Sequence, residues 1–518
     1  MKAKDAITAA EAAAQVRDGD TVASSGFVSS AIPEGLIKAL EARFLETGKP
    51  VGITYFYAGS QGLRDGRGGD RVAHKGMTKR AIAGHYNTAP ALGKAILAGE
   101  IEGYNLPQGT LSQLTREIAA GRPGAITHVG LGTFVDPRLG GGKLNSATTE
   151  DLVELVEILG EEKLLYRSFP IDIAFLRGSY ADEAGNVTMH REIGEGEVTA
   201  LAQAAKNSGG KVFVQVEKIV PAGTLDPRLV KIPRQLVDAL VVADPKDHEQ
   251  TYGCEFDPSL TGESRIQPDA IPAAPLNVKK AIARRAALEL RDDAVVNLGI
   301  GIPEFVASVA NEEGIGDRFI LTVEAGPSGG VPLSGDRFGA AINPECILAH
   351  HEQFDYYDGG GVDMAFLGMA QADKEGNINV SMFSGRLAGC GGFINITQNA
   401  KRVHFCGTFT SGGLEAHIGD GRLAIVKEGR EKKFIDAVEQ VTFSGAYARK
   451  AGQPVLYITE RAVFELREGG VWLTEIAPGV DLETQVLALM GFEPRIAPGG
   501  PVPMDARIFT DAPMKLSL

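Results

Sequence analysis

Short apolar runs alternate with longer amphipathic stretches along most of this 518-residue chain. The apolar runs predict buried strands at Thr21–Ser25, Ile53–Tyr57, Val212–Val216, Ala239–Ala243, Ala294–Leu298, Phe319–Val323, Met364–Leu367 and Val403–Cys406. The stretches between them predict helices, among them Pro33–Phe44, Leu111–Ala120, Val278–Arg291 and Glu304–Glu312. Because strands and helices alternate, we expect an α/β fold with mainly parallel sheets.

The chain contains an internal repeat. Asp172–Leu176 resembles Asp363–Leu367, and the separation of 191 residues (363 − 172) stays constant over about 40 residues. Ile53–Gly59 resembles Ile320–Gly326 at a separation of 267 residues (320 − 53), so the first copy carries 76 extra residues (267 − 191). Unrelated α/β units can converge on similar strand patterns, but the constant separation favours duplication.

The two copies meet in a polar stretch that is rich in proline, 257–275. We therefore predict an N-terminal half, 1–256, a linker, 257–275, and a C-terminal half, 276–518. Each half is expected to be an open α/β domain with a mainly parallel sheet. The cleft between two such domains is the default place for an active site.

Composition narrows the class of protein. Hydrophobic residues make up 44% and charged residues 23%, which is typical of globular chains. No run of 18 apolar residues and no signal-peptide pattern is found, and four cysteines do not make a disulfide framework. We therefore expect a soluble cytoplasmic protein. A net charge of −14 argues against nucleic-acid binding.

Glu324 is the sharpest candidate for chemistry. It follows an apolar strand and precedes a turn with three glycines, where an α/β sheet presents its functional residues. The equivalent residue in the first copy is Tyr57. A shared fold needs the strand and the turn, but it does not need a carboxylate, so we interpret Glu324 as chemistry added to one copy. The alternative is a solvated surface glutamate.

Other loops offer weaker candidates. Gly326–Gly330 matches the GxSxG pattern of serine hydrolases at Ser328, but no suitable helix follows. Bare amides of glycine turns can hold anionic oxygens, and Gln108 could present a side-chain amide or cap the next helix. Further candidates for contacts with a ligand are Gly26, Phe27, Val28, Gly299, Gly301, Gly326 and, as phosphate contacts, Arg138 and Lys143.

Metal binding is not expected. The close groupings of possible ligands are His350–Glu352 and His404–Cys406, and adjacent histidines on a strand would point to opposite faces. Phe27, Tyr57, Phe354 and Tyr356 could wall an acyl pocket, although ordinary core packing is the favoured interpretation for most of them.

Together, the motifs resemble family I CoA-transferases of the kind with two halves in one chain, most closely the propionate (acetate) and acetate/3-oxoacid CoA-transferases. The resemblance covers nearly the whole chain and rests on Ser25–Phe27, Ala31–Glu34, Gln108–Leu111, Gly130–Arg138, Gly141–Lys143, Glu324–Gly326, Phe354–Gly361 and Ala388–Gln398. The family often has Glu-Asn-Gly or Glu-Ser-Gly where this chain has Glu-Ala-Gly. That departure leaves the carboxylate in place.

The resemblance implies reversible transfer of CoA from a short-chain acyl-CoA (acetyl, propionyl or butyryl) to a free carboxylic acid. It places the catalytic glutamate at Glu324 and the oxyanion hole at Gln108 and a backbone amide among Gly389, Gly391 and Gly392. It implies a homo-oligomer, dimer or tetramer, with no cofactor and no metal.

Other functions remain open at the level of sequence. A CoA-thioester hydrolase could use the same glutamate, and a transferase could be specific for 3-oxoacids. A serine hydrolase at Ser328 and a non-catalytic regulator that binds CoA or a nucleotide are more remote alternatives.

Overall fold

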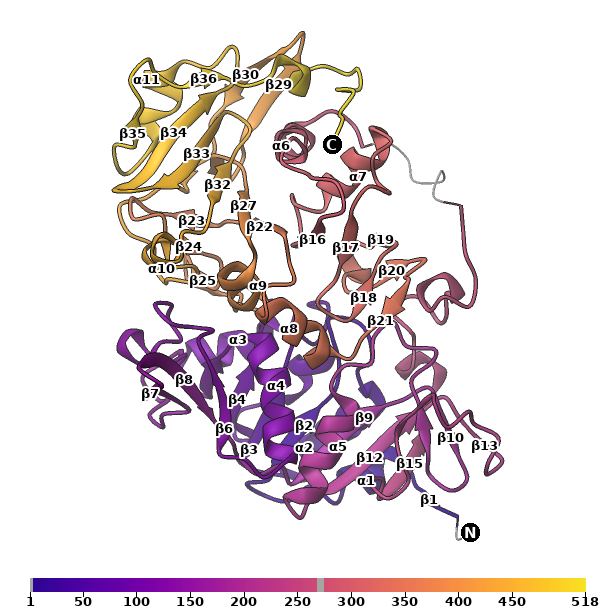
Figure 1. Cartoon of the computed structure of the whole chain (residues 1–518). Coiled ribbons are helices and arrows are strands. Elements are labelled where there is room, and N and C mark those ends of the chain that lie inside the picture. The colour runs from indigo at the N-terminus through magenta and orange to yellow at the C-terminus, as the bar shows by residue number, and fades with distance from the viewer. Residues whose placement is uncertain (1–2, 268–273) are drawn as a thin grey trace. The chain divides into compact units, whose positions relative to one another are not determined.

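The computed structural model describes residues 3–267 and 274–518 (Figure 1). Contacts group the chain into two compact units. The first comprises Met1–Arg265, Val323–Asp355 and Arg386–Asn395, and the second comprises Ile266–Thr322, Tyr356–Gly385 and Ile396–Leu518. The halves 1–256 and 276–518 are a division of the sequence, whereas this grouping by contacts places Glu324 in the first unit. Residues 268–273 of the predicted linker lie outside the described residues.

The first unit is built on an eight-stranded sheet in which every neighbouring pair is parallel. Its strands, in spatial order, are β1 (Asp5–Ala6), β15 (Ala239–Val242), β12 (Lys211–Val216), β9 (Ile173–Arg177), β2 (Thr21–Ser24), β3 (Ile53–Tyr57), β4 (Thr78–Ala83) and β5 (Glu102–Asn105).

Helices cover both faces of this sheet. Strand side chains alternate between faces, and Ile173 and Phe175 of β9 join a core with α1 (Ala9–Ala13), α2 (Glu34–Thr47) and α3 (Pro90–Leu97). On the other face, α4 (Gln108–Ala119) packs beside α5 (Val198–Asn207), which also contacts β9 and β12. The first helix begins at a capping box, in which Thr8 and Glu11 satisfy each other's backbone amides.

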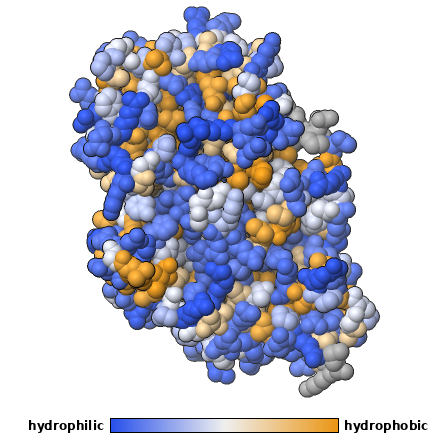
Figure 2. Space-filling view, in the orientation of Figure 1, coloured by the Kyte–Doolittle hydropathy of each residue, from blue (hydrophilic) through white to orange (hydrophobic). Residues whose placement is uncertain are grey.

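Smaller elements complete the first unit. They include the antiparallel sheet β6–β8–β7 and the mixed sheet β13–β10–β11–β14, in which β10 and β13 are parallel. Figure 2 shows apolar side chains gathered over the β7–β8 hairpin. The bounds are β6 (Gly124–Thr127), β7 (Val153–Ile158), β8 (Glu161–Arg167), β10 (Tyr180–Asp182), β11 (Val187–Thr188), β13 (Lys218–Val220), β14 (Val230–Ile232), β18 (Pro327–Ser328), β19 (Val331–Pro332), β20 (Ala341–Ile342), β21 (Cys346–Ile347) and β26 (Arg386–Leu387).

The second unit repeats the central order of strands. Five parallel strands, β17–β16–β22–β27–β32, are extended by the antiparallel strands β33 and β34. The bounds are β16 (Val295–Leu298), β17 (Ile320–Thr322), β22 (Met364–Gly368), β27 (Arg402–Cys406), β32 (Val455–Ile458), β33 (Ala462–Arg467), β34 (Gly470–Ile476), β35 (Arg495–Ile496) and β36 (Val502–Pro503). The helices α6 (Val278–Ala287) and α7 (Phe305–Glu312) pack against each other and share a core with β16, β17 and β22.

Short elements account for the rest. They are β23 (Gln371–Ala372), β24 (Ile378–Asn379), β25 (Met382–Phe383), β28 (Thr410–Ser411), β29 (Glu415–Gly419), β30 (Arg422–Lys427), β31 (Glu431–Lys432), α8 (His350–Asp358), α9 (Phe393–Asn399), α10 (Gly445–Ala451) and α11 (Leu482–Gln485). Within residues 3–267 and 274–518, no helix has the length and apolarity needed to cross a bilayer.

The order of strands confirms the two related α/β halves. In the first unit the order β3–β2–β9–β12–β15 matches β17–β16–β22–β27–β32 in the second. The match extends to an aspartate side chain just before the equivalent strands β9 and β22. The carboxylate of Asp172 accepts a hydrogen bond from the amide of Thr21, and that of Asp363 accepts one from the amide of Val295, both at 2.8 Å. Duplication therefore explains both the repeated sequence and the repeated topology.

Candidate active site

Glu324 lies in a tight turn two residues beyond β17. The turn is closed by hydrogen bonds from the Gly326 amide to the Val323 carbonyl (3.0 Å) and from the Val323 amide to the Pro327 carbonyl (2.9 Å). Gly326 has a φ of +125°, and a Cβ there would lie 2.1 Å from the carbonyl oxygen of Leu348. Glycine is therefore required for the shape of this turn, and Glu324 is left partly buried at its start.

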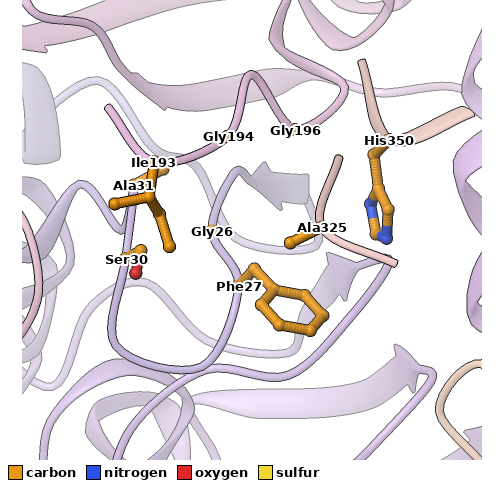
Figure 3. A pocket seen from close by; sticks show the side chains of 9 residues that line it. All are labelled: Gly26, Phe27, Ser30, Ala31, Ile193, Gly194, Gly196, Ala325 and His350. Atoms are coloured by element: carbon orange, nitrogen blue, oxygen red, sulfur yellow. The ribbon is translucent and has the colours of Figure 1, made fainter. Parts of the chain in front are cut away.

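A small pocket opens beside this turn (Figure 3). It is lined by Gly26, Phe27, Ser30, Ala31, Ile193, Gly194, Gly196, Ala325 and His350. Gly26 has a φ of +131° and allows Ile32 to pack closely, since a Cβ would lie 2.6 Å from that side chain. Ala325, the residue that follows Glu324, lines the pocket, and so do the predicted residues Gly26 and Phe27.

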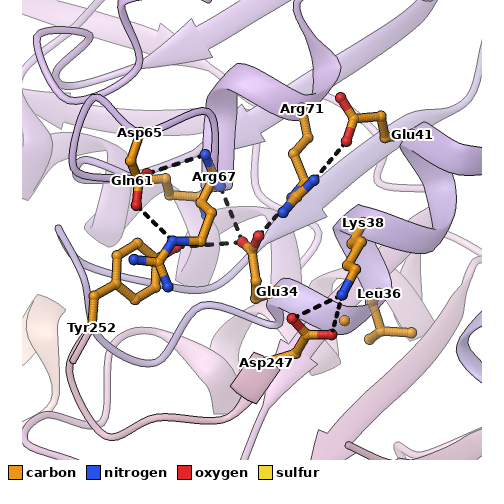
Figure 4. Close-up of polar contacts among 12 residues, drawn as sticks. Glu34, Leu36, Lys38, Glu41, Gln61, Asp65, Arg67, Arg71, Asp247 and Tyr252 are labelled. Carbon is orange, nitrogen blue, oxygen red and sulfur yellow. Dashed lines mark hydrogen bonds and ion pairs between the residues drawn. The ribbon is translucent and has the colours of Figure 1, made fainter. Parts of the chain in front are cut away.

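A polar network fixes the end of the loop that forms one wall of the pocket (Figure 4). The buried carboxylate of Glu34, at the start of α2, accepts hydrogen bonds from the Arg71 guanidinium (2.5 Å) and from the Gly68 amide (3.0 Å). Burial raises the pKa of Glu34, and Arg71 opposes this rise. Lys38, one turn further along the helix, pairs with Asp247 at 2.9 Å. Loop 26–31 therefore leads into a helix start that is held by ion pairs.

Gln108 is the first residue of α4 and its side chain is buried, with 2% of the residue exposed. Its backbone amide donates to the Gly391 carbonyl at 2.9 Å. The loop that bears Gln108 is further joined to segment 389–392, because the side chain of Asn105 accepts a hydrogen bond from the Cys390 amide at 2.9 Å. The structure thus brings together two of the predicted parts of an oxyanion hole, within the first unit.

The amides of segment 389–392 differ in their partners. The Gly391 amide donates to the Gly84 carbonyl at 2.7 Å, and the Cys390 and Phe393 amides also have acceptors in the protein. For the amides of Gly389 and Gly392, no acceptor is found within the described part of the chain. Of the three predicted glycines, Gly391 therefore has its amide engaged by a carbonyl of the protein, which leaves Gly389 and Gly392 as the candidates for the oxyanion donor.

A buried histidine contacts the Gln108 side chain. The Nε2 atoms of His350 and Gln108 lie 2.8 Å apart, and His350 Nδ1 lies 2.8 Å from a carboxylate oxygen of Glu197. His350 and Glu197 are each 2% exposed. Neither residue is predicted from the sequence to belong to the site. The expectation that His350 and His351 lie on a strand is wrong, since His350 begins helix α8.

Several other predicted residues lie elsewhere. Gly299 and Gly301 belong to the β16–α7 turn of the second unit. Arg138 pairs with Asp136 at 2.7 Å and with Glu162 at 2.9 Å, and Lys143 pairs with Asp151 at 2.5 Å. None of these four residues lines the pocket. Their contacts with CoA stay predictions.

Val28 is placed nearer the site. It has a φ of 56° and packs with Val323 and Ala325, which flank Glu324. Phe27 belongs to the same cluster, together with Phe338.

Among the four aromatic candidates for the acyl wall, Phe27 lines the pocket. Tyr57 is fully buried and its hydroxyl donates to the His85 carbonyl at 3.1 Å. Burial raises its pKa well above the usual range. Phe354 is also fully buried, whereas Tyr356 is 46% exposed and belongs to the second unit. Tyr57 and Phe354 are therefore packed core residues.

Two alternative chemistries find little support in this geometry. Ser328 lies in the two-residue strand β18, paired with β21, and not on a sharp turn from a strand into a helix. Throughout the described ranges, no group of three or more His, Cys, Asp or Glu residues is arranged to hold a metal ion.

Comparison with known proteins defines the class. The family model described as "Coenzyme A transferase" matches residues 6–243 and 279–406. The chain is 49% identical to a caffeate CoA-transferase of Acetobacterium woodii, over 95% of both chains. It is 45% identical to the acetate CoA-transferase YdiF of Escherichia coli O157:H7, over 92% of this chain and 90% of the relative. The chain therefore belongs to the coenzyme A transferase family.

Solved structures agree with this assignment. The fold matches the crystal structure of the Escherichia coli O157:H7 acyl-CoA transferase YdiF as apoenzyme, with a TM-score of 0.95 and 42% identity, over 100% of this chain and 98% of that chain. It also matches the crystal structure of YdiF as a thioester complex with CoA, with a TM-score of 0.94 and the same coverage. The protein is thus a CoA-transferase with both homologous halves in one chain.

Proposed function

We propose that this enzyme transfers CoA reversibly between a short-chain acyl-CoA and a free carboxylic acid, by a ping-pong reaction through a glutamyl-CoA thioester on Glu324. The observation that carries the proposal is the position of Glu324, in a glycine turn beside a small pocket and present in one copy of the repeat. The crystal structure of YdiF as a thioester complex with CoA supports the proposal by similarity.

The chemistry needs a nucleophile that can hold CoA. A carboxylate oxygen of Glu324 attacks the acyl-CoA carbonyl, the carbon–sulfur bond breaks, and CoA leaves as thiolate. The thiolate then attacks the glutamyl carbonyl of the resulting anhydride and displaces the first carboxylate. The glutamyl-CoA thioester remains, and a second carboxylate reverses both steps. One thioester is exchanged for another, so these reaction steps use no ATP, metal or titrating base.

Each step passes through a tetrahedral oxyanion, which fixed hydrogen-bond donors stabilise. The side-chain amide of Gln108 and the backbone amide of Gly389 or Gly392 are the donors in this proposal. Loss of one such donor costs about 3 kcal/mol in comparable sites.

Short acyl groups are proposed from the resemblance to the acetate and propionate enzymes. The pocket beside the Glu324 turn has a lining suited to them, because Phe27, Ala31, Ile193 and Ala325 are apolar. Acetyl, propionyl and butyryl groups are the proposed substrates, and propionate and acetate are the proposed acceptors. The chain is also similar to a caffeate CoA-transferase. Caffeate, a bulky aromatic acid, is therefore the acceptor to compare with propionate and acetate. The location of the active site between the halves, a homo-oligomeric state and a cytoplasmic location stay predictions of the resemblance.

An exchange assay tests this function. Wild-type protein is expected to form propionyl-CoA from acetyl-CoA and propionate. Glu324→Gln should reduce the rate to background. Glu324→Asp should retain about 1% or less, because a carboxylate misplaced by ~1 Å can cost about 100-fold. The control is Glu345→Gln, which alters an exposed glutamate of the same unit. Full activity of Glu324→Gln, or equal release of CoA without an acceptor acid, would contradict the proposal.

A further inference from the structure

We infer that His350, held by Glu197, is a positioning residue that sets the orientation of the Gln108 side-chain amide in the oxyanion hole. The three side chains form a continuous buried series, Glu197–His350–Gln108, with 2.8 Å at each contact. Each residue is only 2% exposed. This inference rests on the proposed role of Gln108 as an oxyanion donor.

The proton positions follow from the chemistry of the groups. An ionised carboxylate only accepts hydrogen bonds, so Glu197 requires the proton of His350 on Nδ1. The His350 Nε2 atom then carries a lone pair and requires a donor. Gln108 must therefore turn its Nε2 group, and not its Oε1 atom, toward the imidazole.

The same contact determines what remains for the substrate. A side-chain amide nitrogen carries two protons in the plane of the amide. One proton of Gln108 Nε2 is engaged by His350, and the second is left for an acyl oxygen. If the amide were reversed, two acceptors would face each other at 2.8 Å and the donor would be lost. The contact with buried His350 thus determines whether the Gln108 side chain presents an N–H group to the oxyanion hole.

Backbone contacts locate His350 relative to the nucleophile. The His350 amide donates to the Gly196 carbonyl at 3.0 Å, one residue before Glu197. The Leu348 amide donates to the Gly326 carbonyl at 3.0 Å, in the turn that bears Glu324. The segment that carries the histidine is therefore tied both to the Glu197 loop and to the Glu324 turn.

Packing holds the imidazole ring from the sides. Phe27 meets it edge-on with ring centroids 5.9 Å apart, and Phe354 lies 5.3 Å away. Figure 3 shows His350 beside Ala325 and Phe27 at the wall of the pocket. Since both ring nitrogens are engaged by protein groups, this arrangement orients the amide and does not exchange a proton with the substrate.

A double-mutant cycle tests the inference. Gln108→Ala is expected to lower kcat about 100-fold. His350→Ala should lower kcat about 10-fold, with the KM values for acyl-CoA and acid changed less than about 2-fold, because the lost interaction acts on the transition state. In the Gln108→Ala background, His350→Ala should cost less than about 2-fold. A residue that acts through Gln108 has nothing further to lose once Gln108 is gone.

Two further variants keep the result interpretable. His350→Gln can place a carbonyl acceptor near the position of Nε2, so it should recover most of the activity that His350→Ala loses, and it carries the test if His350→Ala fails to fold. His351→Ala changes the next residue of α8, which lies outside this series of hydrogen bonds, and it should stay within about 2-fold of wild type.

The outcomes separate the two claims. If the losses from Gln108→Ala and His350→Ala multiply in the double variant, while wild type transfers CoA, the positioning role is overturned alone. The same holds if His350→Ala keeps full kcat. A wild-type protein without exchange activity would overturn the proposed function and this inference with it.

Discussion

Two equivalent residues, Glu324 and Tyr57, show what the fold requires and what chemistry adds. Tyr57 ends β3 inside the core, and its hydroxyl satisfies a backbone carbonyl. Glu324 follows the equivalent strand, β17, in a turn beside a pocket. The same backbone pattern therefore accommodates a packed aromatic ring in one copy and a partly exposed carboxylate in the other. A carboxylate at this position is not a requirement of the fold.

Only the locally encoded part of the site could be predicted. Glu324, Gly26 and Phe27 each stand in a turn or loop after a strand, and Gln108 begins the helix that follows β5. The contacts of His350 could not be predicted in this way, because they join residues 242 and 153 positions apart in the chain. No spacing rule encodes such contacts. The sequence favoured an ordinary packed or surface histidine over a metal ligand at His350, but it did not reveal the contact with the Gln108 amide.

A single buried histidine gives the protein a measurable sensitivity to acid. Burial lowers the pKa of His404 to about 3, and the ring stacks on Phe366 with centroids 4.6 Å apart. The unfolded chain binds a proton at this residue near pH 6.5. Between about pH 6.5 and 3, the unfolded state therefore carries the extra proton, and lowering the pH through this range removes stability.

The variant His404→Gln lacks this titrating group, so its free energy of unfolding should depend less on pH. We expect the free energy of unfolding of wild type relative to the variant to fall by about 2 kcal/mol between pH 7.5 and pH 5.0. Urea unfolding at both pH values measures it. A difference between the two proteins that stays constant with pH would contradict the burial of a neutral His404.

At the level of elements, the loop between β11 and α5 packs directly against the turn that contains Glu324. Gly194 lies in the loop between β11 and α5, and a Cβ there would come within 2.6 Å of the Ala325 carbonyl oxygen. Gly194→Ala should displace the Glu324 turn. A misplacement of ~1 Å can cost about 100-fold, so we expect kcat to fall by about 10- to 100-fold in the exchange assay.

The control for this substitution is Gly93→Ala in α3. Its new Cβ would meet its nearest neighbours at 3.9 Å, which is ordinary contact, and alanine favours the helix. Gly93→Ala should keep wild-type kcat. Wild-type kcat in Gly194→Ala would show that the loop does not determine the position of the nucleophile.

The central elements of both sheets could be predicted from the pattern of apolar runs. All eight predicted strands occur, for example Ile53–Tyr57 as β3 and Val403–Cys406 within β27. Their apolar runs are continuous because central parallel strands are buried on both faces. The antiparallel additions, such as β7–β8 and β33–β34, are largely amphipathic or short, and their pairing depends on partners that a single strand does not specify.

At the scale of the whole molecule, duplication and specialisation of one α/β unit account for the main features. The two central sheets share one order of strands and one pattern of aspartate contacts. The first copy carries extra residues in the stretch that includes α4 and Gln108, and the second copy has Glu324 where the first has Tyr57. In the proposed reaction, each copy therefore contributes a different group.

The central claim is that Glu324 carries CoA as a thioester. The most direct measurement is mass spectrometry of the protein after incubation with acetyl-CoA alone, followed by proteolysis and mapping of the adduct. Trapping with borohydride or hydroxylamine should change the mass of the peptide that contains Glu324, and Glu324→Gln should abolish that change. An adduct on another residue, such as the exposed Cys346, or rapid exchange without any adduct on Glu324, would contradict the account.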